Sequence, residues 1–355
     1  MAQETYALGG SPRVTINTCG GNLEIAGQEI DRVAVKSGRL QRVAQVGDQL
    51  AIEQCDDDLS LALPRGTTLV MQRAGGDARV DGLAAMQLGD AGGDLSARFI
   101  EGACTVGRVG GDLRATDVGM LAIQTVHGNA RIERVTGGAE IARVDGDLRV
   151  SDVANLALGA VGGNAHLEGL AGVLRLDRAG GDATVRGAVD GFTAAINGDL
   201  TLDIAYTSGH EYRLDVHGDA KVLLPADAGL TLHATVAGDV KGIDGTRLIP
   251  GDSSTDGGSI RAAWGDGRAR LTLYVDGNLS MRETDARGRT DMPAPAQMNA
   301  AGWTDEAVPV EANAATDPTV PIGSTDTELS VLEAVTRGDL SPAEADDLLS
   351  RPREK

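Results

Sequence analysis

A glycine followed directly by Asp or Asn recurs along most of this chain at a nearly constant spacing. Eight such glycines are separated by 17 or 18 residues: Gly76, Gly93, Gly111, Gly128, Gly146, Gly163, Gly181 and Gly198. The step continues at Gly218 and Gly238 with spacings of 20 residues, and outlying copies occur at Gly21 and Gly277. A fixed period of this kind is the signature of a repeat architecture.

Each repeat unit contains two short runs in which apolar and polar residues alternate, as they do in β-strands. One unit has its apolar residues at Leu113, Ala115, Val118, Leu121, Ile123 and Val126, and the same pattern returns 35 residues later from Leu148 to Val161. One unit cannot bury its apolar face alone, but units stacked about 4.8 Å apart can. We therefore predict an all-β fold, a right-handed parallel β-solenoid with coils of 17–18 residues. A meander of antiparallel hairpins is the alternative.

The Gly-Asp and Gly-Asn steps are interpreted as turns. In this interpretation glycine supplies a positive φ and the Asp or Asn side chain closes an Asx-type turn. Asn replaces Asp at Asn22, Asn129, Asn164 and Asn278, which suits a turn and weakens a calcium site. The chain also lacks the GGxGxDxUx pattern of calcium-binding repeats, so we expect no metal site and no cofactor.

Composition restricts the core and the partners. The chain has 49 Gly but only eight aromatic residues, which indicates a thin core of aliphatic side chains. Cys19, Cys55 and Cys104 show neither a disulfide framework nor a zinc pattern, and we interpret them as buried small hydrophobic residues. A net charge of −20 repels phosphate backbones and anionic lipid surfaces, so no nucleic-acid partner is expected.

Targeting signals are not visible in the sequence. The opening MAQETYALGG lacks the charged and apolar regions of a secretory signal, and no apolar run is long enough to span a bilayer. We therefore expect a cytoplasmic protein without direct membrane insertion, associated with the cell envelope, if at all, through a partner.

The pattern divides the chain into four parts. Residues 1–70 alternate less regularly and are expected to form an N-terminal β cap and the first coils, because a solenoid needs atypical terminal repeats. Residues 71–282 carry the solenoid repeats, with 242–266 as an excursion and 268–282 as a last strand pair. Residues 283–325 are rich in Pro and poor in apolar periodicity, which predicts a disordered linker. Residues 326–355 are expected to form a helical hairpin.

The hairpin prediction depends on two consecutive capping boxes. Thr325 with Glu328 begins one helix and Ser341 with Glu344 begins the next, while Gly338 ends the first. Helices this short are not stable separately, so they must pack on one another, on the solenoid as a C-terminal cap, or on a partner. The apolar stripes and one isolated aromatic residue of the linker are therefore the candidate partner-binding residues: Leu329, Leu332, Val335, Leu340, Leu348, Leu349 and Trp303.

Two segments carry a resemblance to known families. The repeats contain Leu63-Pro64-Arg65-Gly66-Thr67-Thr68-Leu69 before one Gly-Gly-Asp step and Leu224-Pro225-Ala226-Asp227-Ala228 before a later Gly-Asp step. With these motifs, residues 5–282 resemble the bacterial putative-adhesin β-strand-repeat family, whose function is unknown. The segment LSVLEAVTRGDLSPAEADDLL is similar to the SHOCT-like hairpin of Gram-positive envelope-stress response proteins. The resemblance implies a β-solenoid in stress response or surface interaction, without assigned catalysis.

We expect a non-enzymatic scaffold or interaction protein, monomeric or a low oligomer, which binds another protein through the hairpin. No catalytic residue is assigned, because the five histidines have no fixed spacing to a nucleophile, and they are interpreted as exposed turn residues. One alternative is a self-assembling structural protein similar to the bactofilins. The other is a β-helix that binds or cleaves polysaccharides.

Overall fold

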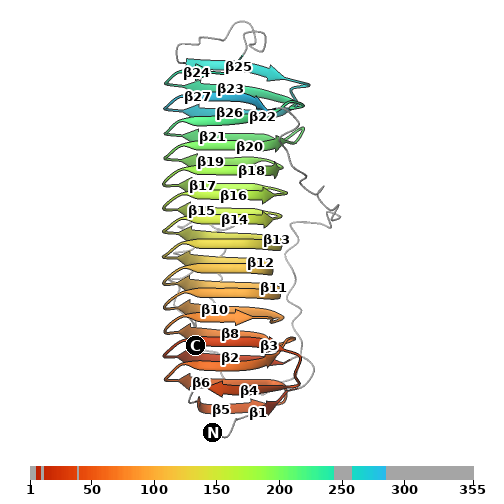
Figure 1. The fold of residues 1–355 in the computed structure, drawn as a ribbon, viewed down its shortest axis with the longest axis vertical. Coiled ribbons are helices and arrows are strands. Elements are labelled where there is room, and N and C mark those ends of the chain that lie inside the picture. Colours follow the sequence, from red (N-terminus) through yellow and green to blue (C-terminus); the bar gives the residue numbers. More distant parts are fainter. Residues whose placement is uncertain (1–4, 9–11, 38–39, 244–257, 285–355) are drawn as a thin grey trace, which may run out of the picture. The chain divides into compact units, whose positions relative to one another are not determined.

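The computed structural model describes residues 5–8, 12–37, 40–243 and 258–284. They all belong to the first of two compact units, Met1–Ala296 and Gln297–Lys355. Within these ranges the fold is all-β, since 27 strands and no helix are present. The strands stack in register along one axis (Figure 1). The linker was predicted at 283–325, but Glu283 and Thr284 end strand β27 (Leu279–Thr284), so the predicted start of the linker was wrong. The rest of the linker and the hairpin at 326–355 lie outside the described residues, as do Trp303 and all six apolar hairpin candidates.

Most strands belong to one of two columns, which lie one behind the other in the stack. The first column contains β2 (Arg13–Cys19), β6 (Gln49–Cys55), β8 (Thr68–Ala74), β10 (Ala85–Ala91), β15 (Leu156–Val161), β17 (Leu174–Ala179), β19 (Phe192–Ile196), β21 (Glu211–Val216), β23 (Leu230–Val236) and β26 (Ala269–Val275). The second contains β3 (Leu23–Gln28), β7 (Leu59–Pro64), β9 (Ala78–Asp81), β14 (Leu148–Val153), β16 (Ala165–Leu170), β18 (Ala183–Val189), β20 (Leu200–Tyr206), β22 (Ala220–Pro225), β24 (Val240–Lys241) and β27 (Leu279–Thr284).

Three long strands run through both columns, and four others are antiparallel to their neighbours. The long strands are β11 (Leu95–Val109), β12 (Leu113–Val126) and β13 (Ala130–Val144). The antiparallel strands are β1 (Thr5–Ala7), β4 (Arg32–Ser37), β5 (Leu40–Val46) and β25 (Gly258–Trp264). We call one first-column strand and the second-column strand that shares its level a rung.

The repeat period appears directly in the strand pairing. Leu113 lies opposite Ala130, and Ala130 lies opposite Leu148, so in the central repeats each strand pairs with one that is 17 or 18 residues away. These ladders are parallel, which excludes the antiparallel meander for the repeats. The prediction of an all-β fold with stacked parallel strands is therefore confirmed.

The core contains the aliphatic residues that the alternation predicted to point inward. Val118 and Ile123 are 1% and 4% exposed, and the equivalent positions Val153 and Leu158 are 1% and 2% exposed. These residues belong to one continuous cluster of buried side chains that includes every repeat. Each inward position is thus a ladder of like residues, as stacking requires.

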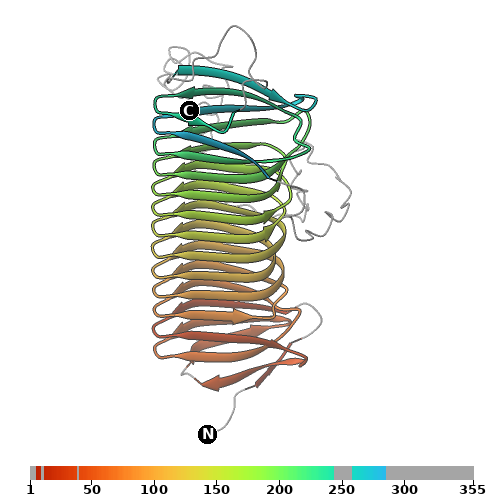
Figure 2. The same ribbon diagram turned by 45° about the horizontal axis from the view of Figure 1, so that its top comes forward.

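The order of rungs in the stack differs from the order of the sequence at both ends. Near the N-terminus, β2 pairs with β6 on one side and with β8 on the other, and β3 lies in the same way between β7 and β9. The rung of residues 13–28 is therefore inserted between the rungs of residues 49–64 and 68–81. The turned view of Figure 2 shows this end of the stack.

The other end repeats the arrangement. β26 lies between β21 and β23, and β27 lies between β22 and β24. The segment 268–282, expected as a last strand pair, is last in sequence but not in the stack. Its rung is inserted below that of residues 230–241, because the chain passes over one level before it returns.

The two Leu-Pro motifs form the connections that skip a level. Thr67 N–H donates to the Pro64 carbonyl at 3.0 Å, and Ala228 N–H donates to the Pro225 carbonyl at 3.0 Å. Both connections therefore begin with the same turn, a Pro carbonyl that accepts from the residue three positions later. The turn directs the chain past the inserted rung at each end.

Candidate functional site

The Asp and Asn residues of the repeated step form a continuous ladder along the stack. Asp94 N–H donates to Asp77 Oδ1 at 2.9 Å, and Asp112 N–H donates to Asp94 Oδ1 at 2.8 Å. The same bond, 2.7–2.9 Å long, joins thirteen residues in this order: Asp58, Asn22, Asp77, Asp94, Asp112, Asn129, Asp147, Asn164, Asp182, Asp199, Asp219, Asn278 and Asp239. Each side chain therefore binds the backbone of the adjacent rung.

This geometry corrects the expected role of the glycine. The glycines of the repeated step do not have positive φ; the residues that do are elsewhere. A Cβ on Gly93 would lie 2.1 Å from Asp77 Oδ1, and one on Gly92 would lie 2.1 Å from the Gly75 carbonyl oxygen. Glycine is needed because adjacent rungs approach too closely here for a side chain. The turn interpretation was right about the Asx hydrogen bond but wrong about its partner, which lies one rung away.

A row of mainly basic side chains runs beside the ladder, two residues further along each rung. Its members face outward and are neighbours in register, in the order Arg79, Ser96, Arg114, Arg131, Arg149 and His166. The side chains of Arg114, Arg131 and Arg149 are about half exposed. Sequence analysis did not single out these residues, although the 35-residue interval between Arg79, Arg114 and Arg149 is visible in the sequence.

The ladder and the basic row are the two walls of an open groove of about 990 Å³. The groove crosses eight rungs, from the rung of Asp58 to that of Asn164. At a spacing of about 4.8 Å per rung it is about 34 Å long. Between the walls lie the backbone and inward residues such as Leu95, Leu113 and Leu148. Along the six rungs from Arg79 to His166, Asx acceptors thus line one side and mainly basic donors the other, whereas the two outermost rungs have Glu24 and Ser60 at the row position.

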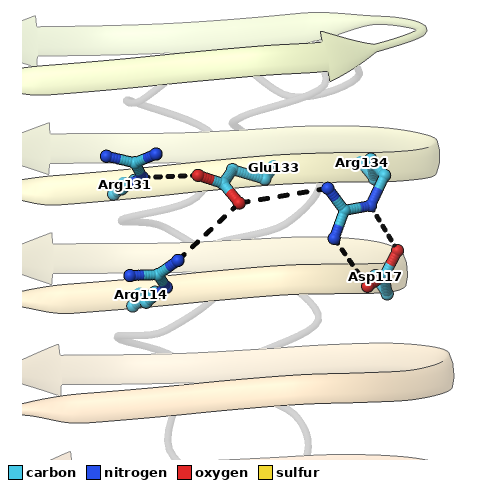
Figure 3. Close-up of polar contacts among 5 residues, drawn as sticks. All are labelled: Arg114, Asp117, Arg131, Glu133 and Arg134. Carbon is cyan, nitrogen blue, oxygen red and sulfur yellow. Dashed lines mark hydrogen bonds and ion pairs between the residues drawn. The ribbon is translucent and has the colours of Figure 1, made fainter.

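Partly buried carboxylates hold the basic row in place. Figure 3 shows Glu133 beside Arg131 on one strand, with Arg114 on the neighbouring strand. One Glu133 carboxylate oxygen lies 3.9 Å from Arg114 Nη2, and the other accepts a hydrogen bond from Arg131 Nε. Arg134 Nη1 lies 4.0 Å from Glu133 Oε2. Arg134 Nε and Nη2 donate hydrogen bonds to the two carboxylate oxygens of Asp117, at 2.6 and 2.8 Å. Hydrogen bonding from Arg131 lowers the pKa of Glu133, and hydrogen bonding from Arg134 lowers that of Asp117.

A similar arrangement returns 35 residues later with two changes, since His166 replaces Arg131 and Arg186 of the next rung takes the place of Arg134. Glu168 takes the place of Glu133, and its neighbours are His166 at 2.8 Å, Arg186 at 3.1 Å and Arg149 at 3.9 Å. Burial acts to raise the pKa of Glu168, but His166 and Arg186 outweigh it and hold the pKa below its ordinary value. Two successive clusters therefore fix the orientation of the basic row over most of its length.

Some of the histidines lie at exposed turns, as predicted, and others do not. His127 and His217 lie at turns and are exposed, each 2.8 Å from a carboxylate, that of Asp145 and that of Asp276. His166 and His233 instead lie within strands β16 and β23, so the expectation that all five are exposed turn residues was wrong. The alternation of the strands places them, because both occupy outward positions.

The described residues contain no group of three or more His, Cys, Asp or Glu side chains arranged to hold a metal ion. They also contain no helix with the length and hydropathy needed to cross a membrane. The groove itself offers guanidinium donors and Asx acceptors that already bind backbone N–H groups. This combination suits ligand binding.

Comparisons with known proteins add little. No family model matches the chain, and no curated protein matches it. Among solved structures, the chain is similar to a crystal structure described as a putative cell adhesion protein from Clostridium sporogenes ATCC 15579. The alignment covers 80% of this chain and 99% of that chain at 11% identity, with a TM-score of 0.18. At this TM-score the similarity carries no functional conclusion.

Proposed function

We propose that this protein is a non-enzymatic interaction scaffold, built on a right-handed parallel β-solenoid, that binds an extended polymer along the groove between the Asx ladder and the basic row. The observation that carries the proposal is the alignment of outward-facing, mainly basic side chains with the Asx ladder over the six rungs from Arg79 to His166. A surface that repeats in one dimension is suited to a ligand that repeats in one dimension.

The dimensions of the groove favour a thin ligand over a folded protein. The two walls are two residues apart, or about 6.6 Å, so the floor measures on the order of 200 Å². A stable protein–protein interface buries about 800 Å² on each partner. A folded protein would therefore need contacts well outside the groove, whereas a single extended chain would not.

The rung spacing favours a polysaccharide over a peptide. An extended peptide presents side chains of one face about every 6.7 Å, which falls out of register with rungs about 4.8 Å apart. The length of one sugar unit in an extended β-linked glycan is close to the spacing between rungs, so successive units lie over successive rungs. Sugar hydroxyls both donate and accept, and they suit a groove with Asp112 on one side and Arg114 on the other.

The ends of the stack support a monomer or low oligomer over a filament. β5 pairs with β6 at one end, and β25 pairs with β23 at the other, and both pairs are antiparallel. End-to-end growth would require the regular parallel edge of a repeat, which these strands cover. The bactofilin-like alternative is therefore less favoured. Binding of a second protein by residues 326–355 remains a proposal from the sequence.

Calorimetry with oligosaccharides of defined length tests the proposal. We expect β-1,4-linked oligomers of glucose to bind more tightly as they lengthen from two to seven units. Replacing Arg114, Arg131 and Arg149 together by Gln should weaken binding at least tenfold. The matched control replaces Arg108, Arg143 and Arg178 by Gln. These arginines recur at the same 35-residue interval, and the strand segments that contain them pair within the first column.

Three outcomes would contradict the proposal. They are an equal loss of binding in both triple variants, an affinity that does not depend on oligomer length, and no binding of any oligomer at millimolar concentration. A poly-glutamate peptide of equal length distinguishes glycan recognition from simple attraction to arginine. Tighter binding of that peptide than of the sugars would replace the polysaccharide by an acidic chain.

A further inference from the structure

Two cysteines that are far apart in sequence are direct neighbours in the stack. Cys19 ends β2 and Cys55 ends β6, and they are opposite each other in the parallel ladder between these strands. The insertion of the rung of residues 13–28 brings them together, since residues 49–64 stack on its outer side. Cys104 is separate, because its neighbours in register are Met86 and Leu121.

Both thiols are directed at the same backbone atom. Cys19 Sγ lies 3.4 Å and Cys55 Sγ lies 3.3 Å from the Asp57 carbonyl oxygen. The two sulfur atoms therefore cannot be farther apart than the sum of these distances. Each cysteine is 1% exposed. Burial, and next the neighbouring Cys55, raise the pKa of Cys19 to about 11.

The backbone fixes the separation of the pair. Gly20 N–H donates to the Cys55 carbonyl at 2.7 Å, and Gly75 N–H donates to the Cys19 carbonyl at 2.7 Å. Adjacent strands of a sheet are about 4.8 Å apart. Disulfide-bonded cysteines have Cα atoms about 4.4–6.8 Å apart, so this pair lies within reach of a bond with a small movement of the two Cβ atoms.

We propose that Cys19 and Cys55 are a redox-modification site, at which a small-molecule disulfide is exchanged for a cystine bridge between the two outermost parallel rungs of the N-terminal end. One cysteine attacks the disulfide of oxidised glutathione, forms a mixed disulfide and releases one glutathione. The other cysteine attacks the protein sulfur of that mixed disulfide and releases the second glutathione. Two protein thiols are oxidised, the glutathione disulfide is reduced, and the two thiol protons leave with the products.

The bridge would join the strands on which the antiparallel end strands depend. It closes a covalent loop from residue 19 to residue 55, which contains β3, β4 and β5. Because the bridge restrains the opened chain, opening of this end becomes less favourable, and exchange of backbone amide hydrogens in β4 and β6 should slow by about tenfold. Because both thiols are buried, the exchange reaction proceeds through local opening and is slow in the native protein.

Refolding of the full-length protein in a glutathione redox buffer tests the proposal, because glutathione can reach both thiols before the fold buries them. We expect the refolded protein to lose two of its three alkylatable thiols and a mass of two hydrogens, and a peptide map to join Cys19 to Cys55. Cys104 should remain alkylatable. Cys104→Ser should leave the bridge unchanged, whereas Cys19→Ser should remove it.

A comparison of bridge formation in the folded protein and in the unfolded chain shows whether the fold favours the bridge. The ratio of bridged to reduced protein at a fixed glutathione ratio should be at least tenfold higher in buffer than in concentrated urea. An equal ratio in both conditions, three free thiols after refolding, or a bridge that includes Cys104 would each overturn the proposal. None of these results bears on sugar binding, which is tested with the arginine variants.

Discussion

Replacing Asp112 separates the hydrogen-bonding role of the Asx ladder from its charge. Asp112 Oδ1 accepts the Asn129 backbone N–H at 2.7 Å and the Asn129 side-chain amide at 3.3 Å. Asn keeps an oxygen in the same position and removes the charge, and Asn is already present at four ladder positions. Ala removes the acceptor, and the turn then has no bond to the next rung through this side chain.

The magnitudes predict that Asp112→Ala lowers the stability and that Asp112→Asn leaves it nearly unchanged. A hydrogen bond to a charged group contributes about 1.5–3 kcal/mol, but water can replace part of it at this exposed turn, so Asp112→Ala should cost about 1–2 kcal/mol. Asp112→Asn weakens the bond but also removes repulsion from the adjacent ladder carboxylate, about 1 kcal/mol at one rung spacing in water. The two effects nearly cancel, and we expect a change within about 0.5 kcal/mol.

Hydrogen exchange at single-residue resolution is the suitable assay, because a long stack need not unfold in one step. The Asn129 amide should exchange about tenfold faster in Asp112→Ala than in the wild type, since 1.4 kcal/mol corresponds to a factor of ten. It should exchange at nearly the wild-type rate in Asp112→Asn. Equal acceleration in both variants would refute the hydrogen-bonding role, and no acceleration in either would refute the ladder as a source of stability.

The remaining predictions concern the core, the partly buried carboxylate of Glu133, the ends and the turns. Val118→Asp should unfold neighbouring rungs at a cost of several kcal/mol, whereas Val118→Ile should be mild in thermal melts. The lowered pKa of Glu133 implies a stabilising contribution that is complete above the ordinary glutamate pKa and is lost as the pH falls through the lower folded value; Glu133→Gln should remove this part of the acid sensitivity in pH-dependent melts. Negative-stain microscopy should show no filaments at physiological salt. Calorimetry with millimolar calcium should show no stoichiometric sites, and a heat for several equivalent sites would contradict the turn interpretation.

The repeated fold could be predicted from the sequence because its signal is local. The alternation within each unit identifies the strands, and the period identifies which positions stack, so Val118, Val135 and Val153 were recognisable as one inward ladder. The basic row was equally visible as arginines 35 residues apart. It was not recognised, because outward positions carry no burial signal and a row of side chains has meaning only once the rungs are aligned.

The ends could not be predicted in this way, since their arrangement depends on which rungs pair and not on how each rung is patterned. Spacing between glycines lengthens to 20 residues after Gly198, which is consistent with longer connections but does not show that one of them passes over a level. The adjacency of Cys19 and Cys55 follows only from that topology. From their separation in the sequence, none of the three cysteines was expected to lie beside another, and this was correct for Cys104.

The insertion of a rung at each end gives a physical reason for the irregular terminal sequences. A rung added in sequence order would pair on one side only and expose a regular parallel edge, which is the surface on which another copy could add. Here the rungs of residues 13–28 and 269–284 pair on both sides, and the outer levels are covered by antiparallel strands of different pattern. The Leu-Pro turns at Pro64 and Pro225 make this possible by the same local geometry at both ends. A stack that closes its ends in this way keeps its long groove as its repeating exposed surface, which favours recognition along the side of the stack over assembly through its ends.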